Sequence, residues 1–434
     1  MSDLHRPDWP LVKISDLAEI NIGGTPSRAA PHFWAAKPEG SPWIAISDLK
    51  DKYVDDTKEY ITDLGAKCSN VKLIEPFTTV MSFKLTVGRT AITTRPMYCN
   101  EAIAIFSPKN DALSGGWLYH ALPRAALSVV TDNAVKGATL NKAKMAEMTV
   151  QLPPITEQRK IAQILDTLDT AILETEALID KLKAVKQGLL HDLLTRGIDA
   201  NGQLRPPQSE APQLYKESPL GWIPKEWSWG TLGRWLIGKP KNGYSPQEAG
   251  EWTGIQMLGL GCLTKDGFFP AQLKSAPARD KRLEGALLNE GDLLISRANT
   301  RELVGLVGVY RDVGTPCTYP DLMIRLTPSE ETCSEFLQLV LQSNRVRRQI
   351  QAAASGTSES MVKISGSIVM GLQITMPASG EQSIILCRVK ALDGQLQSEL
   401  ERRKGLQAIK TGLMDDLLTV RVRVTPLLAP GGGP

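Results

Sequence analysis

Residues that build metal sites, disulfides and membrane spans are scarce or scattered in this 434-residue sequence. The six cysteines include no CxxC pair, and the four histidines are equally dispersed. We therefore expect no zinc site and no disulfide framework, only free cysteines in a reducing cytoplasm. No apolar run approaches the roughly 20 residues of a membrane-spanning helix. The opening residues, MSDLHRPDWP, lack the apolar core of an export signal, so we expect a cytoplasmic protein.

Motifs for catalysis are also missing. GRWLIGKP, residues 233–240, has the spacing of a phosphate-binding loop, but Pro240 replaces the Ser or Thr that would hold magnesium. Proline also removes a backbone donor where phosphates need one. The sequence has neither the Asn-Pro-Pro-aromatic motif of amino-methyltransferases nor a nuclease motif of Pro-Asp followed by Glu-x-Lys. We expect a chain that carries out no catalysis and holds no cofactor and no metal.

The composition is that of a globular protein, with 42% apolar and 22% charged residues. The length is sufficient for two or three domains, each with its own core. The net charge of +3 permits a nucleic-acid partner without arguing for one, because proteins that only coat phosphate are usually far more basic.

The sequence contains a tandem repeat. LPPITEQRKIAQIL, which begins at Leu152, is matched by MPASGEQSIILCRV, which begins at Met376. At the same separation, KQGLLHDLLT is matched by KTGLMDDLLT. Upstream, VMSF pairs with LISR, AIFSP with IRLTP, WLYHAL with FLQLVL and GATLNK with GTSESM, at separations that drift. Each copy therefore consists of a variable, mixed region followed by a long helix.

Both long helices carry apolar stripes with the heptad period of a coiled coil. The stripe of the second helix changes phase near Gly405. An amphipathic helix that lies on its own domain is the alternative, but the duplication favours two equivalent helices that pack together. The predicted seam consists of Ile161, Ile164, Leu168, Leu178, Leu182, Val185 and Leu189 in the first helix, and Leu392, Leu396, Leu400, Leu406, Ile409 and Leu413 in the second.

The order of elements predicts an α+β fold with pseudo-twofold internal duplication. Short β-like runs separated by Gly, Pro, Asn and Asp make each mixed region β-rich. An antiparallel pair of the helices would place the two regions at opposite ends of a long two-helix coiled coil. The predicted parts are mixed regions 1–152 and 223–376, helices 153–197 and 377–420, a linker 198–222 and a disordered tail 421–434.

Basic and polar residues gather on matching loops of the two regions. Arg and Asn can form paired hydrogen bonds with guanine and adenine, and Lys, Ser and Thr can hold phosphates. Solvated loop residues are the alternative for each of them. The candidate DNA-binding residues are Lys84, Thr86, Arg89, Lys136, Thr139, Asn141 and Lys142 in the first half, and Arg297, Asn299, Thr300, Arg301, Thr357, Ser358 and Lys363 in the second.

Several of these segments together resemble the specificity subunit of type I restriction-modification systems. They are WPLVKISDLAEINIGGTP, VKGATLNKAKMAEMTVQLPPITEQ, LLHDLLT and YKESPLGWIPKEW. The resemblance implies two target recognition domains, each reading half of an asymmetric, bipartite site in double-stranded DNA. It also implies that the two long helices set the gap between the half-sites and dock two methyltransferase subunits. Restriction/translocase subunits would be further partners. S-adenosylmethionine would belong to the methyltransferase partner, and ATP and Mg to the restriction partner.

The second copy departs from the family pattern. Ala378 and Ser379 replace the second proline and the hydrophobic residue of the helix start, and Gly405 and Gly412 weaken the distal helix. A duplicated coiled-coil scaffold that binds protein partners instead of DNA is the alternative function.

Overall fold

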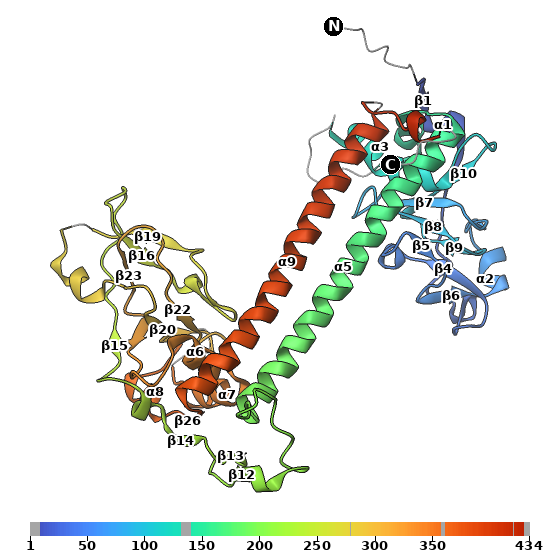
Figure 1. The fold of residues 1–434 in the computed structure, drawn as a ribbon. Coiled ribbons are helices and arrows are strands. Elements are labelled where there is room, and N and C mark those ends of the chain that lie inside the picture. The colour runs from blue at the N-terminus through green and yellow to red at the C-terminus, as the bar shows by residue number, and fades with distance from the viewer. Residues whose placement is uncertain (1–8, 132–139, 278, 357–360, 420, 429–434) are drawn as a thin grey trace. The chain divides into compact units, whose positions relative to one another are not determined.

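The computed structural model describes residues 9–131, 140–277, 279–356, 361–419 and 421–428 (Figure 1). The chain forms two compact units, residues 1–177 with 400–434 (unit 1) and residues 178–399 (unit 2). No helix in the described ranges is both long enough and apolar enough to cross a membrane.

The mixed region of unit 1 is built on two sheets. The larger has the order β2-β10-β7-β8-β5, and the smaller has the order β3-β6-β4-β9. These strands are β2 (Ala18–Ile22), β3 (Trp34–Ala35), β4 (Ser41–Ile44), β5 (Tyr53–Val54), β6 (Glu59–Ile61), β7 (Thr79–Ser82), β8 (Thr90–Thr93), β9 (Tyr98–Cys99) and β10 (Ile103–Pro108).

The larger sheet is buried on both faces, which explains its continuous apolar strands. Met81 on β7 packs in a cluster with Trp117 of helix α3 (Gly115–Thr131). Its neighbour Val80 points to the other face and packs with Ile44. Side chains alternate in this way because successive residues of a strand face opposite sides.

Unit 2 repeats this topology. Its larger sheet has the order β15-β24-β20-β22, which corresponds to β2-β10-β7-β8. In its smaller sheet β16 pairs antiparallel with β19 and parallel with β23, as β4 does with β6 and β9. The duplication seen in the sequence therefore extends to the fold. The strands are β15 (Lys241–Asn242), β16 (Gln256–Leu258), β19 (Leu273–Ser275), β20 (Leu293–Ser296), β22 (Val307–Val309), β23 (Cys317–Thr318) and β24 (Met323–Leu326).

Each mixed region is closed by a strand pair that joins its two ends. β1 (Leu11–Lys13) pairs with β11 (Thr149–Gln151), and β14 (Ser228–Thr231) pairs with β26 (Gln373–Met376). The other described elements are α1 (Ile14–Leu17), α2 (Asp63–Lys67), α4 (Lys142–Glu147), α6 (Ser334–Gln342), α7 (Asn344–Ala353), α8 (Gly366–Gly371), β12 (Tyr215–Lys216), β13 (Ile223–Pro224), β17 (Leu263–Thr264), β18 (Gly267–Phe268), β21 (Ala298–Asn299) and β25 (Val362–Lys363).

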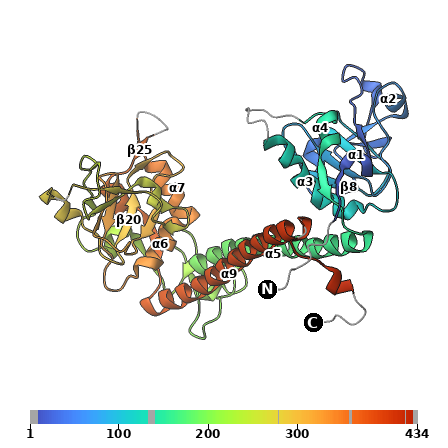
Figure 2. The same cartoon turned by 90° about the horizontal axis from the view of Figure 1, so that it is seen from above.

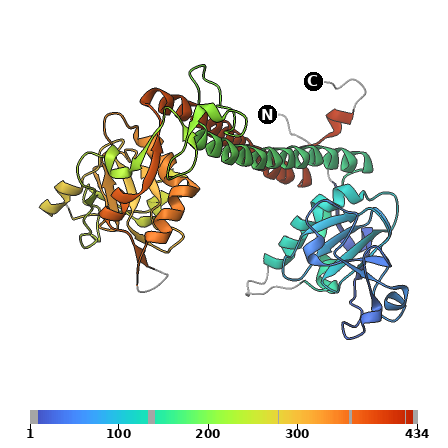
Figure 3. The same cartoon turned by 90° about the horizontal axis from the view of Figure 1, so that it is seen from below.

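The long helices are α5 (Ile155–Thr195) and α9 (Ser379–Leu418). In unit 1 the start of α5 lies beside the end of α9, where Asp169 pairs with Lys410 (Figure 2). In unit 2 the end of α5 lies beside the start of α9, where Lys186 Nζ is 2.6 Å from Asp393 Oδ1 (Figure 3). The two helices thus run antiparallel in each unit.

Five residues of the predicted seam lie off the observed stripe, namely Ile164, Leu178, Val185, Leu400 and Ile409. Leu178, Val185 and Ile409 are 38%, 48% and 53% exposed, whereas Ile179 is 1% exposed. There is also no phase change near Gly405, because one stripe with alternating spacings of four and three continues through each helix. Its buried and partly buried members are Ile161, Leu165, Leu168, Ile172, Thr175, Ile179, Leu182, Lys186, Leu189 and Leu193, and, at the equivalent positions of the second copy, Ile385, Val389, Leu392, Leu396, Glu399, Arg403, Leu406, Lys410, Leu413 and Leu417.

The error has a physical cause. The stripe contains long charged residues such as Lys186 and Lys410. A prediction that follows only apolar residues selects the adjacent Val185 and Ile409 instead. Lys186 and Lys410 are only 21% and 25% exposed, because their stems pack along the stripe while their ammonium groups pair with aspartates.

The corrected seam gives a test. We expect Ile179→Ala to lower the free energy of unfolding by about 2–4 kcal/mol, since it removes a buried side chain. The adjacent Leu178→Ala should cost less than about 1 kcal/mol because Leu178 is already largely in water. Urea unfolding followed by circular dichroism measures both, and equal losses would contradict this seam.

Candidate nucleic-acid interface

The turn between β7 and β8 presents three candidate residues of unit 1. Thr86 and Arg89 are exposed, and Lys84 is half-buried. The base of the turn is fixed, because Ser82 N donates to Arg89 O at 2.8 Å and Gly88 N donates to Ser82 O at 2.9 Å. Gly88 has φ +86°, a conformation that glycine adopts without strain. The result is a firm turn with two cationic side chains.

In unit 2 two separate loops meet. β21 pairs with β25, so that Asn299 lies opposite Val362 and Ala298 lies opposite Lys363. Ile364 N also donates to Arg297 O at 2.9 Å. This pairing brings the backbone of Lys363 beside that of Arg297 and Asn299, although Lys363 is far from both in the sequence. Sequence spacing alone could not show this juxtaposition.

Two candidates have structural roles that account for them without DNA. Asn141 Oδ1 accepts a hydrogen bond from Lys144 N at 2.8 Å and caps helix α4. Arg301 Nη1 donates to Gln351 O at 2.8 Å and to Ala354 O at 3.2 Å, at the end of α7.

The cap also corrects one pairing of the repeat. Ser365 Oγ caps α8 in the same way, and Ser365 stands to the second Glu-Gln pair as Asn141 stands to the first. GATLNK therefore corresponds to MVKISG, not to GTSESM. Among the remaining candidates, Lys142 and Thr300 are exposed, and Lys136, Thr139, Thr357 and Ser358 lie outside the described residues.

The glutamine of each Glu-Gln pair anchors a long helix to its mixed region. Gln158 Oε1 accepts from Ser114 N at 2.8 Å, and its Nε2 donates to Ala112 O and Pro153 O, both at 2.9 Å. Gln382 makes the same three bonds, with Cys333 N, Glu331 O and Pro377 O, all at 3.0 Å. Because both amides are buried and satisfied, they fix the helix start with little freedom.

The glutamate of each pair binds an arginine that follows the other long helix. Glu157 is buried and accepts from Arg423 Nε at 2.9 Å, after the end of α9. Glu381 accepts from Arg205 Nη1 at 2.6 Å and Nη2 at 3.2 Å, after the end of α5. Burial alone would lower the pKa of Arg205, but the hydrogen bonds to Glu381 raise it above its usual value. Each glutamate thus ties the start of one helix to the chain that leaves the other.

This contact also corrects the predicted tail. Disorder was expected from residue 421, yet Arg423 pairs with Glu157 and Val424 is 2% exposed in the core of unit 1. The guanidinium of Arg423 also lies 5.3 Å from the ring centre of Trp9. Residues 421–428 are part of the folded unit.

A polar cluster in unit 1 has the composition of a metal site but is explained by ion pairs. Donor atoms of His120, Asp166 and Asp169 lie within 4.8 Å of one another. However, Lys52 Nζ lies 2.5 Å from Asp166 Oδ1, and Lys410 pairs with Asp169. Two lysines therefore balance the two carboxylates.

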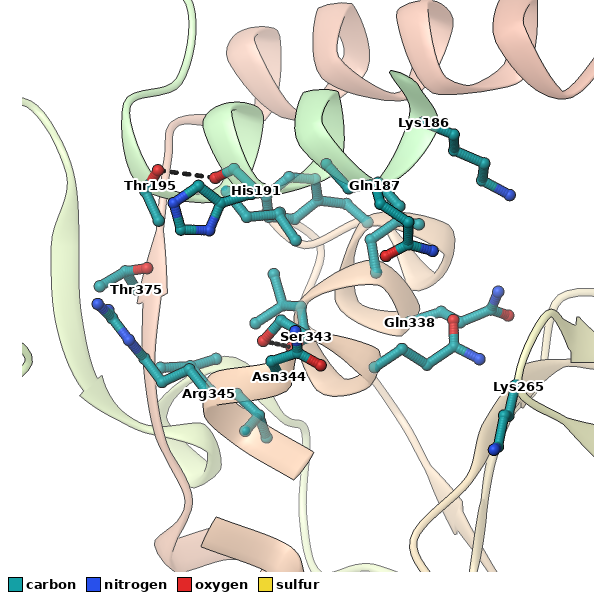
Figure 4. Close-up of a pocket in the computed structure, with 18 of the residues that line it drawn as sticks. Lys186, Gln187, His191, Thr195, Lys265, Gln338, Ser343, Asn344, Arg345 and Thr375 are labelled. Carbon is teal, nitrogen blue, oxygen red and sulfur yellow. Dashed lines mark hydrogen bonds between the residues drawn. The ribbon is translucent and has the colours of Figure 1, made fainter. Parts of the chain in front are cut away.

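Unit 2 contains a cavity of about 560 Å³. Lys186 and His191 of α5 line one side, and Gln338 and Arg345 of α6 and α7 line the opposite side (Figure 4). Lys265, from the turn between β17 and β18, lines a third side. Asp393, which also lines the cavity, pairs with Lys186, so the lining is polar and of mixed charge. It offers no nucleophile activated by a neighbouring base.

The anchors lead to a test. We expect Gln158→Ala and Gln382→Ala each to lower the free energy of unfolding by about 1–3 kcal/mol, because each leaves a buried backbone N–H without its acceptor. Gln163→Ala, an exposed change on α5, should stay within about 0.5 kcal/mol. Urea unfolding measures all three, and a null effect at both anchors would contradict the assigned role.

Comparison with known proteins finds one group of similar proteins. The model of the type I restriction modification DNA specificity domain matches residues 7–184. The MjaVIII specificity subunit of Methanocaldococcus jannaschii is 22% identical over 98% of this chain and 96% of its own length. The EcoKI specificity subunit of Escherichia coli K12 is 24% identical over 80% of this chain and 77% of its own length.

Solved structures show the same fold. One chain, from a study of complex assembly and conformational transition of the type I R-M system, has TM-score 0.59 at 16% identity and covers 95% of this chain and 98% of its own length. The type I S subunit of M. genitalium has TM-score 0.53 at 14% identity, covering 96% and 98%. The matched model ends within α5, and unit 2 repeats the matched topology. Over nearly its whole length the chain is therefore similar to the DNA specificity subunits of type I restriction-modification systems.

Proposed function

We propose that this chain reads an asymmetric, bipartite site in double-stranded DNA, with one half-site bound by domain 1–152 and the other by domain 223–376. The observation that carries this proposal is the repeated topology with unlike loops. Unit 1 presents one cationic turn between β7 and β8, whereas unit 2 presents the paired strands β21 and β25. A common scaffold with different polar side chains suits two readers of different sequences.

Each cluster would combine base and phosphate contacts. Arg297 and Asn299 have the side chains that form paired hydrogen bonds with guanine and adenine, and neighbouring Lys363 can hold a phosphate. In unit 1, Arg89 can contact guanine while Lys84 and Thr86 hold the backbone. Lys142, Thr300, Lys136, Thr139, Thr357 and Ser358 would add further contacts.

We further propose that helices 153–197 and 377–420 act as a coiled-coil spacer that fixes the distance between the half-sites. With 41 residues, α5 is about 60 Å long. The Glu-Gln anchors support this role, because they hold both ends of each helix against a mixed region.

The same helices would dock two methyltransferase subunits, and the complex would include restriction/translocase subunits in the cytoplasm. S-adenosylmethionine would be bound by the methyltransferase, and ATP and Mg by the restriction subunit. Support comes from the relatives, which are specificity subunits of type I restriction enzymes. No observation favours the alternative function, a coiled-coil scaffold that binds protein partners instead of DNA.

Arg297→Ala tests the reading of bases. If this side chain contacts a base, binding should weaken by about 1–3 kcal/mol and discrimination should be lost at one position of one half-site. Lys265→Ala is the matched control, because Lys265 pairs with Glu302 on the surface of the same unit. Binding of duplexes with single-base changes, at two salt concentrations, measures both variants. A uniform loss across all sequences with a smaller salt dependence would assign Arg297 to a phosphate instead.

The spacer is tested by inserting four residues in each helix, after Glu176 and after Leu400, which occupy equivalent positions of the two copies. The insertion adds about 6 Å and about 40° of rotation. Because B-DNA rises about 3.4 Å per base pair, the gap should grow by one or two pairs while both half-sequences stay the same. Sequencing of methylated sites in a host that carries the whole system gives the result. An active variant with the original gap would show that the helices do not set the spacing.

A further inference from the structure

A leucine stands fully in solvent at the tip of the cationic turn of unit 1. Leu85 is 93% exposed and has φ +63°. Thr86 N donates to Lys84 O at 2.7 Å, which makes a three-residue turn with Leu85 at its centre. A positive φ is rare for a residue with a branched apolar side chain, and this form of three-residue turn is strained.

The surrounding structure holds the strain in place. Ser82 and Phe83, just before the turn, are 0% and 3% exposed. Phe83 N donates to Ala102 O at 3.0 Å, and the bonds of Ser82 with Gly88 and Arg89 close the turn. Strain of this kind persists only where its neighbours determine the conformation, and it is a common feature of functional sites.

Neither the positive φ nor the full exposure of Leu85 stabilises the chain on its own. Glycine would fit this φ without cost, and a polar residue would suit full exposure. The charges on either side of the turn indicate that it binds an anionic partner. Two cations, Lys84 and Arg89, flank the apolar tip. Lys84 also acts on Glu101, whose pKa is lowered by its hydrogen bond from Thr25 and, in part, by the charge of Lys84.

Phe77 shows that strain and exposure alone do not make such a site. It has φ +61° and is 71% exposed, at the opposite end of the same strand, β7. Its near neighbours in the chain include Glu75 and no cation. The Leu85 end of the strand carries Lys84 and Arg89 in the turn itself, which makes it complementary to a polyanion.

We propose that Leu85 is an apolar base contact in the first half-site, with Lys84 on the phosphates beside it and Arg89 on a neighbouring base. The proposal rests on the function proposed above. Apolar side chains contact the thymine methyl group in the major groove or insert between base steps, and lysine and arginine position the protein on the backbone. Leu85 is thereby a specificity-determining residue of domain 1–152.

Leu85→Gly separates stability from recognition, because the two should respond in opposite directions. The urea midpoint should stay the same or rise, since glycine relieves the turn. Binding of the target duplex should fall about tenfold with an unchanged salt dependence, because the lost contact is apolar and no charge is removed. Leu85→Asn, which tolerates a positive φ, should lose affinity similarly, and Leu85→Met should keep most of it.

The measurement uses the chain assembled with the modification subunit of its own system and a duplex that carries the target found by methylome sequencing. Phe77→Gly is the matched control and should leave binding unchanged. If the wild-type complex shows no sequence preference, the proposed function fails. If it binds specifically and Leu85→Gly and Leu85→Asn bind as tightly as the wild type, the assignment of Leu85 is overturned.

Discussion

The buried pairing of a glutamate with an arginine at each long-helix start is the contact on which the rest of the architecture depends. Glu157 binds Arg423, and Glu381 binds Arg205. In each case the arginine follows the other long helix. A carboxylate buried beside a helix start needs such a partner, since an unpaired charge there would be strongly destabilising. The pair therefore fixes where one helix begins relative to where the other ends, and the adjacent glutamine fixes the mixed region to the same point.

The folded cores are separate from the proposed DNA-binding surface. The apolar clusters that include Trp117 in unit 1 and Phe336 in unit 2 hold sheets and helices together. The cationic turn of unit 1 and the β21–β25 pair of unit 2 protrude from those cores. Loop residues of this kind can change with little effect on folding stability. One topology can then carry two different loop surfaces within a single chain, as the proposed function requires.

In the helix seam, some stability is exchanged for a defined register. Its charged members, Lys186 and Lys410, pack their stems and pair their ends with Asp393 and Asp169. Charged seam positions give less stability than leucine but specify register, because only one alignment brings each lysine to its aspartate. The proposed spacer role needs such a specified register, because it requires a defined length.

The sequence by itself determined the duplication, the two long helices, the β-rich regions and the resemblance to type I specificity subunits, because repeated motifs and hydrophobic periods are local signals. It also located the polar loops. It did not determine the seam. Leu178 and Ile179 are both apolar, and only the packing of the helices shows that Ile179 is buried and Leu178 is exposed. Nor did the sequence show that Asn299 lies beside Val362, that Asn141 is a helix cap, or that Arg423 folds onto Glu157. These features depend on contacts between residues that are distant in sequence. Such contacts stabilise the fold only after the chain between them has closed into a loop, which costs conformational entropy.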